Sequence, residues 1–245
     1  MKFKYILILS ALIGQILSLS AREVTSFNEG WLFKRGPFSQ DPVKVAAQWN
    51  ADWETVNLPH TWNAKDMQVK ADAFYEGVGY YRKTQFFGNE LKGKRVFLRF
   101  EGVGANTEVY VNGKLVGMHR GAYSAFAFEI GTALKLGAEN EIMVKADNAS
   151  RSDVIPVNHN LFGVYGGIYR PVWLEIKPKE HIDRVAVNAL CDGHLLADVY
   201  LSGAKSGYCL LATVENLKSG ELLKEHSFQL TDSATFYRLD TQWED

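Results

Sequence analysis

The chain has 245 residues, enough for one large or two modest domains, and its hydrophobic content of 47% is ordinary for a protein with a buried core. Its formal net charge is −1. This balance gives no electrostatic basis for binding nucleic acid or an anionic membrane, so both classes of partner are excluded.

Residues 1–21 have the pattern of a secretory signal peptide. Lys2 and Lys4 give a positive start, Tyr5–Leu19 is mostly apolar, and small residues at 18–21 offer a cleavage site. The alternative is an uncleaved membrane anchor, but the apolar stretch is short and interrupted for a bilayer span of about 20 residues. We therefore expect a secreted or periplasmic location, with no membrane segment in the mature form.

Residues 22–179 are strand-like almost throughout. Aromatic and β-branched residues alternate with polar ones, and turn residues separate the runs at intervals of roughly 8–12 residues, which is typical of an all-β sandwich or barrel. We predict a jelly-roll β-sandwich, with single helical turns at most near Pro42–Trp49 and Thr132–Leu136. The expected strands are Trp31–Arg35, Glu54–Leu58, Gly79–Phe87, Arg95–Phe100, Asn106–Val111, Lys114–His119, Ala125–Ile130, Glu141–Asp147 and Ile168–Ile176.

The clearest local signal is the sequence E-V-Y-V-N-G-K-L-V. Asn112 and Gly113 both tolerate positive φ, which a two-residue type I′ hairpin turn requires. Val109 and Val111 flank Tyr110, so one face of the strand should be buried and the other should not. The sequence therefore predicts a tight hairpin at this point.

A second domain is predicted for residues 180–245, after a linker at 177–179. Its pattern favours an immunoglobulin-like β-sandwich, but 66 residues fall short of the roughly 100 of a complete domain of that kind, so we expect a truncated sandwich. Cys191 and Cys209 either form a disulfide or remain as two buried, reduced thiols on neighbouring strands. The expected strands are Arg184–Leu190, Leu195–Leu201, Tyr208–Val214, Leu222–Phe228 and Thr235–Leu239.

Several motifs in the same order resemble glycoside hydrolase family 2, which includes β-galactosidases, β-glucuronidases and β-mannosidases. The most specific is the Y-G-G-I-Y-R-P-V-W-L-E run within residues 158–175, which resembles the last strand of the family's N-terminal sugar-binding domain. The others are F-N-E-G-W-L-F at 27–33, V-N-L-P-H-T-W-N at 56–63, G-Y-Y-R-K at 79–83, and R-V-F-L-R-F-E-G-V at 95–103 followed by V-Y-V-N-G at 109–113. The resemblance covers essentially all of the mature chain.

The resemblance implies retaining hydrolysis of O-glycosidic bonds by two glutamates, one acting as acid and one as nucleophile. Both belong to a following (β/α)₈ barrel, a domain of about 250 residues. We therefore assign no catalytic, cofactor-binding or metal-binding residue in this chain. The expected function is the N-terminal portion of a secreted β-galactosidase-like enzyme, itself non-catalytic, whose partners are carbohydrate, the missing C-terminal catalytic barrel and further copies in a homo-oligomer.

Two loops are the candidates for contact with sugar. Tyr75 and Glu76 pair an aromatic ring with a carboxylate, and in family members this loop lies near the sugar subsite. Asn158, His159 and Asn160 stand beside the position where the family often carries an aspartate, here Leu161, and their side chains both donate and accept hydrogen bonds. The alternatives are a solvated turn charge beside a packed tyrosine at the first loop, and asparagines that cap a turn at the second.

Three other features are assigned no role in sugar binding. In the P-H-T-W-N turn, Trp62 should fill the core, and we favour a structural over a ligand role for His60. Arg170 should form a buried ion pair that pins its loop to the sheet. Asn148 begins an N-A-S sequence that matches an N-glycosylation acceptor, a motif frequent by chance.

Two other classes of function remain open at this stage. The chain is either a free-standing carbohydrate-binding, lectin-like module or a structural pair of β-sandwiches with no sugar ligand. Binding to a glycan array separates the first of these from the second.

Overall fold

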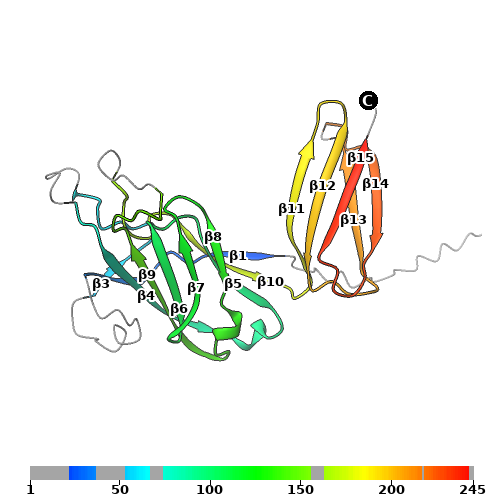
Figure 1. Ribbon diagram of the computed structural model, residues 1–245. Helices are drawn as coiled ribbons and strands as arrows, with labels where there is room; N and C mark the ends of the chain where they lie inside the picture. The colour runs from blue at the N-terminus through cyan, green and yellow to red at the C-terminus, as the bar shows by residue number, and fades with distance from the viewer. Residues whose placement is uncertain (1–21, 37–52, 67–73, 156–162, 217, 243–245) are drawn as a thin grey trace, which may run out of the picture.

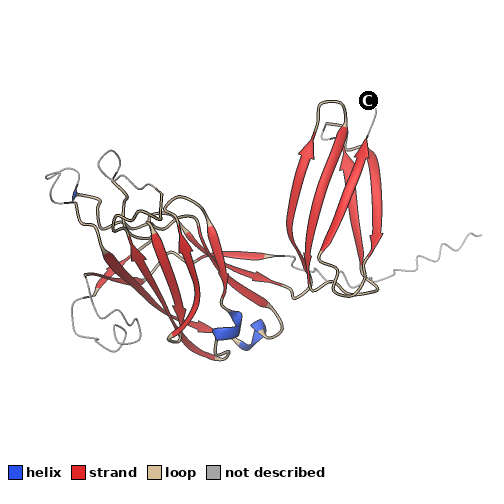
Figure 2. Cartoon of the chain, in the orientation of Figure 1, coloured by secondary structure: helices blue, strands red, loops and turns tan. Residues whose placement is uncertain are grey.

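The fold is almost entirely antiparallel β-sheet (Figures 1 and 2), as the sequence predicts. The computed structural model describes residues 22–36, 53–66, 74–155, 163–216 and 218–242. The predicted signal peptide and the helical turn at Pro42–Trp49 lie outside these residues. Among the described residues, the helical elements include two short 3₁₀ turns, η2 (Asn89–Leu91) and η3 (Gly131–Ala133).

The ten described strands before Pro178 form two sheets that face each other. The six-stranded sheet has the order β3-β2-β4-β9-β6-β7, and the four-stranded sheet has the order β1-β10-β5-β8. The bounds are β1 (Glu23–Ser26), β2 (Trp31–Arg35), β3 (Glu54–Val56), β4 (Val78–Phe87), β5 (Arg95–Phe100), β6 (Asn106–Val111), β7 (Lys114–Arg120), β8 (Phe126–Glu129), β9 (Ala138–Asp147) and β10 (Val172–Lys177).

The core between the two sheets follows from the alternation along each strand. Val96, Leu98 and Phe100 of β5 are buried while the residues between them are not, and Val109 and Val111 repeat this pattern on β6. Successive side chains of a strand point to opposite faces, so each strand contributes every second residue to the interior. This packing confirms the predicted sandwich.

The predicted hairpin joins β6 to β7. Asn112 has φ of 51° and Gly113 has φ of 78°, and Val111 pairs with Lys114 across the turn. The Asn112 side chain also donates to the Asn140 side chain at 2.7 Å, which ties the turn to the neighbouring strand β9. The sequence signal therefore identified both the turn and its backbone conformation.

The last strand of this sandwich begins later than predicted, at Val172 rather than Ile168. Gly167 instead crosses close to the other sheet, forms an isolated bridge with Gly104, and has φ of 110°. A Cβ on Gly167 would lie 2.4 Å from the Tyr81 hydroxyl, so only glycine fits. The Gly-Gly run is thus an irregular loop before the strand.

The five strands described after Pro178 form a second unit of two facing sheets, one with the order β11-β12-β15 and one with the pair β13-β14. Cys191 and Cys209 are both exposed and free, so the expectation of buried thiols is wrong, as is a disulfide between them. Cys191 lies in the turn between β11 and β12, and Cys209 is the first residue of β13. The bounds are β11 (His181–Ala189), β12 (His194–Ser202), β13 (Cys209–Glu215), β14 (Leu222–Gln229) and β15 (Phe236–Gln242).

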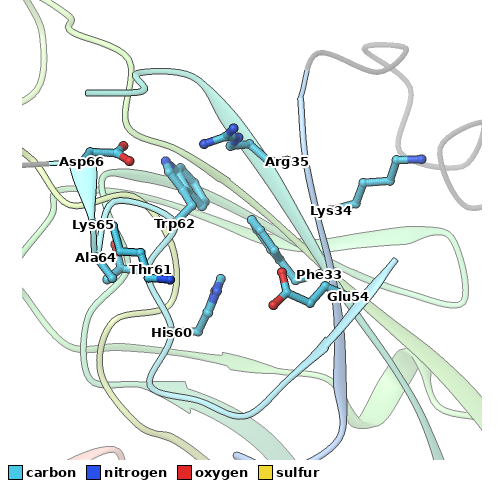
Figure 3. Close-up of a pocket in the computed structure, with 10 residues that line it drawn as sticks. All are labelled: Phe33, Lys34, Arg35, Glu54, His60, Thr61, Trp62, Ala64, Lys65 and Asp66. Atoms are coloured by element: carbon cyan, nitrogen blue, oxygen red, sulfur yellow. The ribbon is translucent and has the colours of Figure 1, made fainter. Parts of the chain in front are cut away.

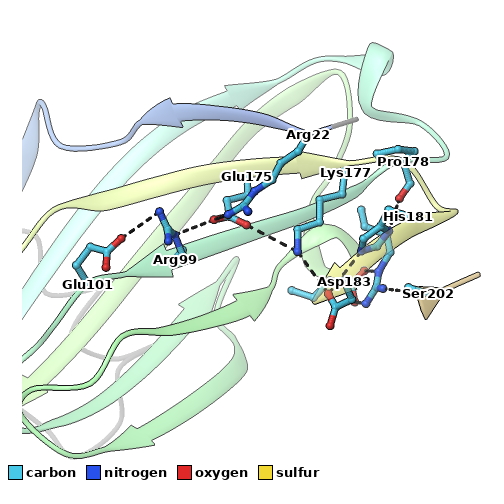
Figure 4. Close-up of polar contacts among 11 residues, drawn as sticks. Arg22, Arg99, Glu101, Glu175, Lys177, Pro178, His181, Asp183 and Ser202 are labelled. Atoms are coloured by element: carbon cyan, nitrogen blue, oxygen red, sulfur yellow. Dashed lines mark hydrogen bonds and ion pairs between the residues drawn. The ribbon is translucent and has the colours of Figure 1, made fainter. Parts of the chain in front are cut away.

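A chain of charges runs from the four-stranded sheet to the start of the second unit (Figure 4). The Glu175 side chain is only 3% exposed and forms ion pairs with Arg22 and, at 2.7 Å, with Arg99. Lys177 lies 3.8 Å from Glu175 and 3.5 Å from Asp183 on β11. A carboxylate this deeply buried needs such partners, because an isolated buried charge is strongly unfavourable.

Candidate functional site

One end of the first sandwich carries three loops that meet at two buried asparagines. The loops are the turn at 58–66, the segment 74–77 and the segment 163–167, and together they make up the loop end of the sandwich. Asn63 and Asn148 are fully buried, and their side chains hydrogen-bond to each other at 3.2 Å. Buried amides must be satisfied, and each can donate and accept several bonds, so this pair fixes the loops relative to one another.

Asn148 connects the end of β9 to two of the loops. Its Nδ2 donates to the Val164 carbonyl at 2.8 Å and to the Tyr75 carbonyl at 3.2 Å, and its Oδ1 accepts from the Gly77 N–H at 2.8 Å. Because this side chain is wholly enclosed, the N-A-S sequence cannot serve as a glycosylation acceptor in the folded chain.

Asn63 completes the connection from the turn that carries it. Its Nδ2 donates to the Asp66 carboxylate at 2.7 Å and to the Tyr75 carbonyl at 2.9 Å, while its Oδ1 accepts from the Gly166 N–H at 2.7 Å. Asp66 in turn accepts from the Tyr75 N–H at 3.1 Å. Backbone and side chain around Tyr75 are therefore held from several directions.

Tyr75 and Glu76, predicted to contact sugar, lie at this loop end in different environments. The half-buried Tyr75 ring meets Trp62 edge-on at 6.3 Å, and the Arg35 guanidinium lies 4.7 Å from its centroid. Burial raises the pKa of the Tyr75 hydroxyl, which donates to the Val78 carbonyl at 3.3 Å. Glu76 is exposed, so its carboxylate is presented at the rim of the loop end.

The other predicted contacts, Asn158, His159 and Asn160, lie outside the described residues. The chain is described again from Gly163, where Phe74 meets Tyr165 edge-on at 6.2 Å. Tyr165 is 43% exposed. The sequence did not predict this aromatic pair, although both residues lie within or beside the two loops predicted to contact sugar.

A cavity of about 690 Å³ adjoins these loops (Figure 3). Phe33 and Trp62 stack at 5.8 Å, and the His60 ring packs on Phe33 at 4.6 Å. Figure 3 shows these three rings together, with Lys34 directed away from them. The lining residues are Phe33, Lys34, Arg35, Glu54, His60, Thr61, Trp62, Ala64, Lys65 and Asp66.

Trp62 packs into the core as the sequence predicts, and both His60 and Trp62 line this cavity. Trp62 is buried, and His60 Nδ1 lies 2.8 Å from the Tyr81 hydroxyl. Burial lowers the pKa of His60, which favours the neutral imidazole. Aromatic walls, a neutral imidazole and a charged rim suit a polar ring with apolar faces, the general character of a sugar.

Arg170 does not form the predicted buried ion pair. It is exposed, and its guanidinium donates to the Tyr123 carbonyl at 3.5 Å and lies 5.7 Å from the Tyr169 ring centroid. The reason is the late start of β10, which leaves Arg170 on the surface loop before the strand. Tyr169 holds this loop instead, since its hydroxyl donates to the Ala122 carbonyl.

Among the described residues there is no group of three or more histidine, cysteine, aspartate or glutamate side chains placed to hold a metal ion. No helix in the described part of the chain has the length and apolarity needed to span a bilayer.

The profile of the glycosyl hydrolases family 2 sugar binding domain matches residues 21–178. The chain belongs to glycosyl hydrolase family 2. The match spans the two sheets and the loop end described above. Family membership therefore rests on the same residues that build the candidate site.

Relatives of this family 2 chain are considerably longer. A β-glucuronidase of Bacteroides fragilis is 41% identical over 161 residues, covering 65% of this chain and 22% of the relative. A β-galactosidase of Thermoanaerobacter pseudethanolicus is 33% identical over 208 residues, covering 83% of this chain and 26% of the relative. A Bacteroides fragilis crystal structure, provisionally described as a β-galactosidase, is 52% identical with a TM-score of 0.78, covering 91% of this chain and 36% of that one.

Proposed function

We propose that this chain is the N-terminal portion of a secreted family 2 β-glycosidase, in which residues 22–179 contribute sugar-contacting loops but no catalytic group. The match of the sugar-binding profile to residues 21–178 carries this proposal. The chain spans about a fifth to a third of the length of the relatives compared above. Hydrolysis with retention would then be performed by two glutamates on a (β/α)₈ barrel.

The loop end supports the proposal because it is rigid where a sugar-contacting surface must be. The buried amides of Asn63 and Asn148 set the positions of the loops before any ligand arrives. A preorganised site loses less conformational entropy on binding. Glu76 then offers an acceptor for hydroxyl groups, and the exposed ring of Tyr165 offers a face for apolar C–H groups.

For the sugar itself we propose a β-galactoside. The names of the relatives are divided between β-galactosidases and β-glucuronidases. The informative experiment therefore compares the affinity of the chain for a β-galactoside with its affinity for the matching β-glucuronide. A β-galactoside that binds more tightly than the matching β-glucuronide supports the proposal, and the reverse order contradicts the choice of sugar.

Saturation-transfer NMR on the full chain with methyl β-galactoside tests the contact surface. Glu76→Gln should reduce the saturation transfer, because a neutral amide is a weaker acceptor than a carboxylate. Glu90→Gln is the matched control, since Glu90 is an exposed glutamate on η2, outside these loops. Equal transfer for both variants would refute the role of Glu76, and hydrolysis of a nitrophenyl β-galactoside by this chain alone would refute its non-catalytic assignment.

Secretion is proposed from residues 1–21. In a bacterial host with a general export pathway, the mature protein should be recovered outside the cytoplasm with an N-terminus near Arg22. Sequencing of that N-terminus measures this directly. Retention of the intact chain in the cytoplasm would contradict the proposal.

A further inference from the structure

A second cavity lies at the end of the first sandwich opposite the loop end, where β10 ends. Its volume is about 370 Å³, and two segments of the same pattern line it, Lys92-Gly93-Lys94 and Lys177-Pro178-Lys179. Because Lys177 pairs with Arg95 in the ladder between β10 and β5, the two segments continue side by side beyond that ladder. We call this cavity the lysine pocket, and its lining residues are Glu23, Lys92, Gly93, Lys94, Ile176, Lys177, Pro178, Lys179 and Glu180.

A tight turn presents Lys92 and Lys94. The Lys94 N–H donates to the Leu91 carbonyl at 3.0 Å, and Gly93 between the two lysines has φ of 80°. That backbone conformation favours glycine, and no atom beyond the adjacent residues lies within 4 Å of the place where a Cβ on Gly93 would be. The turn is therefore fixed by its backbone and stands open to solvent.

The charges around the lysine pocket are only partly balanced. Four lysines and two glutamates line it, a formal surplus of two positive charges in a chain whose net charge is −1. Lys177 has acidic neighbours outside the lining, since it lies 3.8 Å from Glu175 and 3.5 Å from Asp183 (Figure 4). Glu180 is also engaged, because it forms an ion pair with Lys205 at 2.5 Å.

The other three lysines of the pocket lack a carboxylate partner. Lys92, Lys94 and Lys179 are exposed, and none of them forms an ion pair within 4 Å in the part of the chain that the structure describes. Like charges gathered in a concave site raise the local concentration of ions of the opposite sign. An anionic ligand is therefore the species that this arrangement attracts.

The apolar part of the lining indicates a larger ligand than a bare ion. Ile176 and Pro178 line the pocket and are half-buried. Apolar side chains suit the C–H groups of a sugar ring, while ammonium groups form charge-assisted hydrogen bonds with an acidic substituent. Small-molecule pockets have volumes of about 300–1,000 Å³, and this one is near the lower limit, so it suits a single sugar residue.

We propose that the lysine pocket binds an acidic residue of a polysaccharide. Lys92, Lys94 and Lys179 surround its anionic group, and Ile176 and Pro178 contact its ring. The site is separate from the loops proposed to contact a galactoside, because it lies at the other end of the sandwich. The proposal therefore does not rest on the function proposed above, and each can fail without the other.

Isothermal titration calorimetry on the full chain tests this proposal. The acidic probes are an oligogalacturonate, which carries carboxylates, and a dextran sulfate oligomer, which carries sulfate esters. Neutral dextran has rings without charge, and oligoglutamate has carboxylates without rings. At least one acidic oligosaccharide should bind about fivefold tighter than either comparison. Its affinity should fall when the salt is raised from about 0.05 M to about 0.5 M, because salt screens exposed charges.

Two triple variants locate the contact. Changing Lys92, Lys94 and Lys179 to glutamine together should weaken binding of the tighter acidic oligosaccharide about tenfold, because three exposed charge contacts are lost. The control variant should bind as the unaltered chain does. It removes the same number of exposed lysines elsewhere, with the same change in net charge: Lys114→Gln, Lys135→Gln and Lys218→Gln. All six positions are exposed, so both variants should fold, and urea unfolding checks this.

Three results would overturn the proposal. Equal loss of affinity in the two triple variants would show that general charge, rather than the lysine pocket, attracts the ligand. Oligoglutamate that binds as tightly as the acidic oligosaccharides would show that the pocket does not recognise a sugar ring. No binding of either acidic oligosaccharide would leave the lysines with the role of protecting the nearby sheet edge at β1, as lysines do on exposed edge strands.

Discussion

Replacing Asn148 by alanine should destabilise the first sandwich strongly, because the side chain satisfies backbone groups on two loops. The Gly77 N–H and the Val164 carbonyl have no second hydrogen bond among the described residues. A buried polar group without a partner costs about 1–3 kcal/mol, and Gly77 is only partly buried. The free energy of unfolding should therefore fall by about 2–4 kcal/mol.

Asn63→Ala provides an internal comparison. It leaves only the Gly166 N–H without its partner, because Asn148 still bonds to the Tyr75 carbonyl. Its cost should be smaller, about 1–3 kcal/mol. The double variant should cost less than the sum of the two single variants, since the side chains share partners.

The assay is urea unfolding followed by tryptophan fluorescence, with the midpoint and the slope compared among variants. Asn188→Ala is the matched control, because Asn188 is an exposed asparagine on β11, and its substitution should change stability by less than about 0.5 kcal/mol. The reasoning is wrong if Asn148→Ala loses no more stability than this control.

Three further predictions concern other parts of the first sandwich. Gly166→Ala should lower the free energy of unfolding by about 1–3 kcal/mol in urea, because the new Cβ would lie 2.0 Å from the Trp62 ring; unchanged stability would contradict this packing. Burial lowers the pKa of His60 below 6.5, so the unfolded chain takes up the proton first and stability falls as the pH drops below 6.5 toward the lowered value. His60→Gln should therefore make unfolding free energy less steep against pH in that range, and an identical slope would count against it. Glu175→Gln should cost about 3 kcal/mol at neutral pH, since it leaves several cations around a site that is only 3% exposed, and a neutral result would show that the surrounding charges are solvated.

Much of the fold was predictable because strand alternation and turn chemistry are local. The bounds of β5 and β6 agree with the expectation at both ends, and the Asn112-Gly113 turn adopts the expected backbone conformation. The strand β1 was missed because its residues are exposed, so it shows no alternation of burial. It is recognisable only from its pairing with β10, which lies about 150 residues later.

The candidate site was predictable in part, because its loops carry family motifs but its internal contacts are long-range. The resemblance pointed to Tyr75 and Glu76, whereas Asn148 stood out only as the start of a glycosylation motif that is frequent by chance. No local pattern indicates that Asn148 meets Asn63, which is 85 residues away in the sequence. The exposed position of Arg170 was missed for a related reason, since the bridge between Gly104 and Gly167 delays the start of the strand.

The most direct test of the proposed sugar-binding role is a titration of the isotopically labelled full chain with methyl β-galactoside. The backbone amide chemical shifts are measured by NMR at each step of the titration. The account predicts saturable shifts at the loop end, including the amides of Glu76, Gly77 and Gly166, with little change on β11–β15. Shifts confined to other surfaces, or no shifts at any concentration reached, would contradict it.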